Sequence, residues 1–123
     1  MPEKRILIVD DEPDVLETIQ LTLEMKGYEC LVAYDGFRGL DRARTEKPDL
    51  IILDVMLPGL NGFKICRLLK FDEQYKHIPI IMLTAEAQEK DRLTGEETGA
   101  DYYMTKPFAA DKLLAKVAEF LGK

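Results

Sequence analysis

The nine residues IILDVMLPG, at positions 51–59, begin like a buried strand, end like a turn and place one carboxylate between the two. A short, continuous run of Ile and Leu is typical of a strand that is covered on both faces. Pro58 and Gly59 are strong turn signals. Because a carboxylate is costly in an apolar environment unless it is paired, hydrogen-bonded or metal-bound, we expect Asp54 to have partners elsewhere in the chain.

Similar apolar runs recur along the chain, at 6–9, 30–33, 50–53, 78–83 and, more weakly, 102–104. The segments between them have helical spacing, and they predict helices at 15–25 (closed by Gly27), 36–46, 61–73, 86–98 and 110–121. This strict alternation of strand and helix predicts an α/β fold, a doubly wound five-stranded parallel sheet with helices on both faces. The expected strand order is the flavodoxin-like 2-1-3-4-5.

Composition limits the class of protein. The chain has 123 residues and a formal charge of −6, and it has neither a 20-residue apolar run nor a signal-peptide core at its start. We therefore expect a single domain over 1–123, no membrane and no direct contact with nucleic acid, which requires a basic face. Cys30 and Cys66 lie in apolar contexts and are expected to be reduced, which favours a cytoplasmic setting. Since the last predicted helix reaches almost to Lys123, no output domain is expected within this chain, which either acts alone or is part of a longer protein.

Polar residues follow the predicted strands. In an open parallel sheet, ligands bind beyond the carboxyl ends of the strands, where the strand order reverses. If strand 2 is at the edge, the other four strands are contiguous and bring their end residues to one rim. Those residues are Asp10, Asp11 and Glu12 after the first strand, Asp54 after the third, Thr84 after the fourth and Lys106 after the fifth.

Three carboxylates this close need positive charge. Lys106 supplies one ammonium group, which does not balance Asp10, Asp11 and Asp54, and hard carboxylate oxygens suit Mg²⁺. We expect Mg²⁺ to be held by Asp11 and Asp54, with Asp10 helping directly or through water. Asp54 is then the best-placed nucleophile, Lys106 a counter-charge for phosphoryl oxygens and Thr84 a hydroxyl donor to them.

The chain resembles the receiver domains of two-component response regulators, of the chemotaxis-Y type, over essentially its whole length. The matching features are the Asp10-Asp11 pair, Asp54 in DVMLPGLNG, Thr84 in MLTA and Lys106 in GADYYMTKPF. The resemblance implies that Asp54 accepts a phosphoryl group, in a Mg²⁺-dependent reaction, from a sensor histidine kinase or a phosphotransfer protein. It also implies that the domain is a switch, which catalyses only its own phosphorylation and dephosphorylation.

The resemblance carries further implications. The backbone carbonyl of Met56 would complete the metal site, and the Lys106–Pro107 peptide bond would be cis. Tyr103 would turn inward when Thr84 moves toward the phosphoryl group. The change would appear on the face formed by the helix at 86–98, the fifth strand and the last helix, where a downstream effector or a second copy of the chain would bind.

Simpler interpretations remain beside these. The acidic loop before Pro13 could merely begin a helix, Thr84 could merely cap the next helix, and Tyr103 could be an ordinary strand residue. A different class of function is a small metal-dependent phosphatase of the haloacid dehalogenase type, with Asp10 as nucleophile. That frame, however, requires a second Asp where this chain has Glu12.

Overall fold

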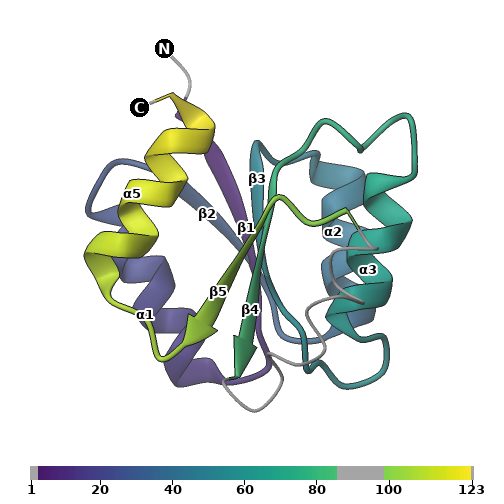
Figure 1. The fold of residues 1–123 in the computed structure, drawn as a ribbon, viewed down its shortest axis with the longest axis horizontal. Helices are drawn as coiled ribbons and strands as arrows, with labels where there is room; N and C mark the ends of the chain where they lie inside the picture. Colours follow the sequence, from purple (N-terminus) through teal and green to yellow (C-terminus); the bar gives the residue numbers. More distant parts are fainter. Residues whose placement is uncertain (1–2, 86–98, 123) are drawn as a thin grey trace.

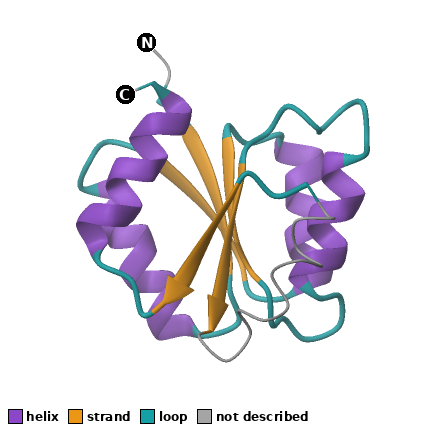
Figure 2. Cartoon of the chain, in the orientation of Figure 1, coloured by secondary structure: helices purple, strands orange, loops and turns teal. Residues whose placement is uncertain are grey.

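The computed structural model describes residues 3–85 and 99–122, and its centre is a five-stranded, all-parallel sheet (Figures 1 and 2). The strand order β2-β1-β3-β4-β5 confirms the predicted fold. The strands are β1 (Arg5–Val9), β2 (Glu29–Ala33), β3 (Leu50–Asp54), β4 (Ile80–Ala85) and β5 (Tyr102–Lys106).

In the described part of the chain, two helices cover each face of the sheet. Helices α1 (Pro13–Glu24) and α5 (Ala110–Leu121) lie on one face, and α2 (Gly36–Glu46) and α3 (Gly62–Lys70) lie on the other (Figure 1). The helix predicted at 86–98 lies outside the described residues. Within the described part of the chain, no helix is long and apolar enough to cross a membrane.

This layering explains the continuous apolar runs of the inner strands. Successive side chains of a strand point to opposite faces, and here both faces are covered, so both sets must be apolar. On β1 and β3 the two sets join different core layers, with Leu7, Val9, Ile51 and Leu53 on the α2–α3 side and Ile6, Ile8, Leu50 and Ile52 on the α1–α5 side.

The last two strands extend further toward their carboxyl ends than the apolar runs predicted. The pairing of Thr84 with Thr105, and of Ala85 with Lys106, continues the ladder beyond the hydrophobic residues. Backbone hydrogen bonds, rather than apolarity, hold these final positions. Lys106 is therefore part of β5, which fixes where its side chain starts.

Two helix ends differ from the sequence predictions. Met25 was expected on the buried stripe of the first helix, but it caps that helix and is 78% exposed. The third helix ends at Lys70, rather than at 73, and Phe71 is its exposed C-cap. In both cases the apolar residue falls beyond the last turn that faces the core.

One glycine allows helix α3 to pack closely against the backbone at the end of β3. The Gly62 N–H donates to the Val55 carbonyl at 2.8 Å, at the start of α3. A Cβ at Gly62 would overlap the Asp54 carbonyl oxygen. Helix α3 can therefore approach the end of β3 this closely only with glycine at its first position.

Candidate functional site

A pocket of about 260 Å³ opens at the carboxyl edge of the sheet. The loop after β1, the end of β3 with the turn after it, and the ends of β4 and β5 contribute its walls. The lining residues are Asp11, Glu12, Asp54, Met56, Ala85 and Lys106. Lys106 is the one cation among these described lining residues.

The Lys106 ammonium group contacts three carboxylates. Its Nζ lies 2.9 Å from Asp10 Oδ2, 3.3 Å from Asp54 Oδ1 and 3.5 Å from Glu12 Oε1. The Lys106 side chain is 17% exposed, and the Asp10 side chain is fully buried. The predicted meeting of the strand-1 acids, Asp54 and Lys106 is therefore confirmed.

Asp10 holds both the lysine and its own loop. Its Oδ1 accepts a hydrogen bond from the Glu12 N–H at 2.9 Å, while its Oδ2 faces Lys106. Helix α1 begins at Pro13, but its N-cap residue, Glu12, makes no side-chain capping bond. The acidic loop does precede a helix, as the simpler interpretation has it, yet capping does not explain its carboxylates.

Burial and neighbouring charge alter the acidity of this site. Burial, as the largest cause, and the charge of Asp10 raise the pKa of Asp54, while the attraction and hydrogen bond of Lys106 lower it; the net result is a pKa of about 6. Burial alone would lower the pKa of Lys106, but its hydrogen bond to Asp10 and the charge of Asp54 outweigh that and raise it. Asp54 is thus a carboxylate of unusual basicity that Lys106 keeps ionisable.

Of the other predicted site residues, one lines the pocket and two do not. Met56 lines it, with a side chain that is 62% exposed. Thr84 is buried near the end of β4, and Tyr103 is half-buried on the α2–α3 side of the sheet; neither is a lining residue. The Lys106–Pro107 bond is cis, as expected.

A cluster of carboxylates borders the pocket. Asp10, Asp11 and Glu12 each offer an oxygen within 4.8 Å of the others. Glu12 is the residue that sequence reasoning passed over as a site candidate. Its signal was present, as the third acid of the loop, but the sequence does not indicate that its side chain turns toward Lys106.

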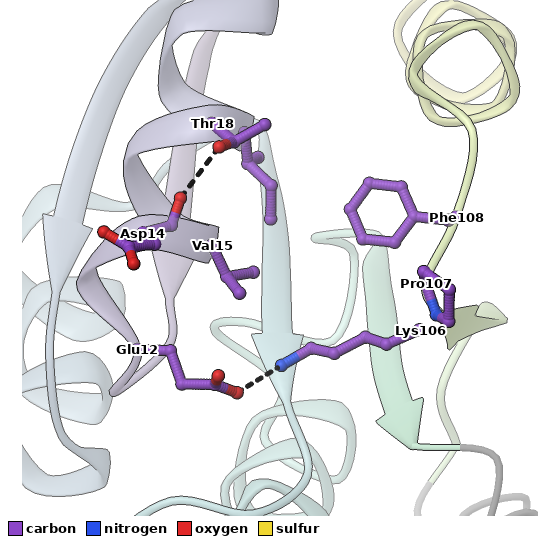
Figure 3. A pocket seen from close by; sticks show the side chains of 8 residues that line it. Glu12, Asp14, Val15, Thr18, Lys106, Pro107 and Phe108 are labelled. Atoms are coloured by element: carbon purple, nitrogen blue, oxygen red, sulfur yellow. Dashed lines mark hydrogen bonds and ion pairs between the residues drawn. The ribbon is translucent and has the colours of Figure 1, made fainter.

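A groove adjoins the pocket between α1 and the segment after β5 (Figure 3). Its volume is about 480 Å³, and the two residues of the Glu12–Lys106 ion pair, drawn in Figure 3, line both the groove and the pocket. The residues that line the groove are Glu12, Asp14, Val15, Thr18, Ile19, Lys106, Pro107 and Phe108.

Comparison with known proteins identifies the family. The model of the response regulator receiver domain matches residues 6–118. The chain belongs to this family. It is 49% identical, over its whole length, to the phosphate regulon transcriptional regulatory protein PhoB of Pseudomonas aeruginosa, and 48% identical, over 98% of the chain, to the alkaline phosphatase synthesis transcriptional regulatory protein PhoP of Bacillus subtilis. It spans about half the length of these curated relatives, 54% and 49% respectively.

A solved receiver domain extends the comparison to structure. It is that of the sensor histidine kinase PA1611 from Pseudomonas aeruginosa, with a magnesium ion coordinated in the active site cleft. The TM-score is 0.90 at 30% identity, over 99% of this chain and 100% of that one. The receiver domain described here is accordingly a signalling switch of two-component systems, and membership of this family decides against the phosphatase alternative.

Proposed function

We propose that this receiver domain accepts a phosphoryl group on Asp54 from a phosphohistidine of a sensor histidine kinase or a phosphotransfer protein. The observation that carries the proposal is the setting of Asp54. Its carboxylate is buried at the end of β3, opens into a pocket and lies 3.3 Å from the Lys106 ammonium group. Among the described residues that line the pocket, no other acid combines burial with a cation beside it.

The proposed transfer balances simply. An Asp54 carboxylate oxygen attacks phosphorus, the phosphorus–nitrogen bond to the donor imidazole breaks, and the imidazole keeps that electron pair. The product is an acyl phosphate on Asp54. Lys106 then pairs with a phosphoryl oxygen in place of the carboxylate oxygen that has become part of the acyl bond. Positioning and charge stabilisation are most of what phosphoryl transfer requires.

The residues present fit a magnesium ion. Carboxylate oxygens are its preferred protein ligands, and Asp10, Asp11 and Glu12 offer three within 4.8 Å of one another. Both Asp10 oxygens already have partners, which favours Asp11 and Asp54 as direct ligands and Asp10 as one that acts through water. The Met56 carbonyl is the proposed backbone ligand. When bound, the ion would neutralise charge between the carboxylates and the phosphoryl oxygens.

The switch itself is proposed to use Thr84 and Tyr103. Thr84 lies at the end of β4 and pairs with Thr105, so a shift of Thr84 toward a phosphoryl group would be felt in β5. Tyr103 is on the same strand, packed against the α2–α3 core layer. A downstream effector, or a second copy of the chain, would bind the face that contains β5 and α5. A cytoplasmic location suits this role, and the related transcriptional regulators suggest a DNA-binding effector rather than direct DNA contact by this acidic domain.

The test is intact mass after incubation with acetyl phosphate and Mg²⁺, with and without chelator, for the native chain and for Asp54→Ala and Asp10→Asn. We expect one metal-dependent phosphoryl adduct on the native chain, none on Asp54→Ala, and an adduct still at Asp54 in Asp10→Asn. An adduct that survives in Asp54→Ala would assign the wrong acceptor. Absence of any adduct on folded native chain would remove the proposal for this donor.

A further inference from the structure

Glu12 differs from the other two partners of Lys106. Asp10 and Asp54 are almost fully buried and are held by the ends of β1 and β3, whereas the Glu12 side chain is 62% exposed. Its carboxylate and the Lys106 side chain line both the pocket and the adjoining groove (Figure 3). Glu12 thus lies on the exposed side of the pocket, at its boundary with the groove, where its charge acts on an incoming phosphodonor.

The charge at that boundary opposes small anions. The pocket already holds Asp11 and Asp54, and Asp10 lies behind them on Lys106. Glu12 adds an exposed negative charge and also competes, at 3.5 Å, for the lysine that a phosphoryl group requires. A donor with two negative charges is therefore repelled by Glu12 and meets a lysine that is already engaged.

We infer that Glu12 is a specificity-determining residue of this receiver, which disfavours small dianionic phosphodonors relative to donors of smaller net negative charge. The inference rests on the proposed phosphorylation of Asp54 and adds a selectivity to it. A charge of −2 at about 6 Å from one carboxylate, in water at physiological salt, is repelled enough to slow reaction about threefold.

Replacement of Glu12 by Gln tests the charge without disturbing the helix start. Glu12 makes no side-chain capping bond, and its N–H bond to Asp10 belongs to the backbone, so the loop should persist. Asp14→Asn is the matched control. It removes the same charge two residues further on, from a residue that lines the groove but not the pocket. Glu12→Asp keeps the charge.

The measurement is the rate of Asp54 labelling at saturating Mg²⁺, followed by intact mass, with two donors. Acetyl phosphate is a dianion at neutral pH, and its phosphorus–oxygen bond breaks with acetate as leaving group. Phosphoramidate carries a smaller net charge and releases ammonia. We expect Glu12→Gln to react about threefold faster than the native chain with acetyl phosphate, and the acceleration with phosphoramidate to be distinctly smaller. In 1 M NaCl the gain with acetyl phosphate should shrink, because salt screens the repulsion. Asp14→Asn should react at the native rate, and Glu12→Asp, which keeps the charge, should lack the acceleration seen in Glu12→Gln.

Three results would overturn the role of Glu12 while leaving the proposed function intact: Glu12→Gln no faster than the native chain, equal acceleration with both donors, or the same gain in Asp14→Asn. A gain that is insensitive to salt would likewise remove the electrostatic mechanism. If the native chain itself is not labelled, or is labelled when Asp54 is replaced, the proposed function fails first. The two failures are therefore separable.

Discussion

Removal of the charge at Asp54 should stabilise the folded domain. A carboxyl group whose pKa rises from 3.8 to about 6 on folding disfavours the folded state at neutral pH. Asn has nearly the same shape as Asp and cannot ionise. In the Asp54→Asn variant, Lys106 keeps Asp10 at 2.9 Å and Glu12 at 3.5 Å, so it is not left as a buried charge without partners.

The size of the effect follows from the two pKa values. Folded Asp54 binds its proton more tightly than the unfolded chain does, so its ionisation destabilises the fold increasingly as pH rises from 3.8 to about 6 and by a constant amount above. The penalty is about 3 kcal/mol at pH 7 and about 1 kcal/mol at pH 4.5. The attraction of Lys106 is already contained in the shifted pKa, so nothing is subtracted for its loss.

The assay is urea unfolding of the native chain and Asp54→Asn in the presence of chelator at pH 4.5 and pH 7. Subtraction at each pH cancels the titration of the groups that do not interact with Asp54. The exposed Asp41→Asn change in α2 is the control and should leave stability nearly the same at both values. An Asp54→Asn variant that is no more stable than the native chain at pH 7, or whose advantage does not shrink at pH 4.5, would refute the reasoning.

Three further perturbations have definite expected outcomes. Mg²⁺ should raise the thermal midpoint of the native chain, by the equivalent of about 1.4 kcal/mol at ten times its Kd, and should do so less for Asp54→Asn; a flat thermal midpoint would count against the site. Gly62→Ala should cost about 1–3 kcal/mol in urea unfolding and slow phosphoryl labelling, because the new methyl group overlaps the Asp54 carbonyl; native stability would contradict this. Asp101→Ala should cost about 2 kcal/mol by the same measurement, because Asp101 Oδ2 accepts from both Lys70 Nζ at 2.9 Å and the Ile80 N–H at 2.8 Å; a loss below about 0.5 kcal/mol would show that water replaces it.

The fold could be predicted from the sequence because its strongest signal is repeated. Five apolar runs alternate with helical segments, and a strand buried on both faces leaves a pattern that a half-exposed strand does not. The approximate site followed from the same pattern, since parallel strands deliver their end residues to one edge. Asp54 and Lys106 are 52 positions apart, yet their strand ends alone were enough to bring them together.

What the sequence did not reveal depends on side-chain direction and on backbone pairing. The turn of Glu12 toward Lys106 depends on the path of the loop after β1, which the Asp10 carboxylate holds by bonding the Glu12 N–H. The hydrogen bond that Lys70 donates to Asp101 joins residues 31 positions apart, just before β5 begins, and no apolar pattern in the sequence predicts it. Met25 shows the opposite error, an apolar residue with no core to face.

The same balance that weakens the fold at Asp54 suits the proposed chemistry. With a pKa of about 6, Asp54 is still about nine-tenths ionised at pH 7, and it is more basic than an exposed aspartate. Deeper burial without a cation would leave it protonated and unable to attack phosphorus, whereas full exposure would make it a weaker base. Lys106 sets this balance. Asp10 holds the ammonium group within reach of Asp54, where its charge lowers the pKa that burial raises. The fold therefore loses stability at Asp54 because this carboxylate must be both buried and charged to act as a nucleophile.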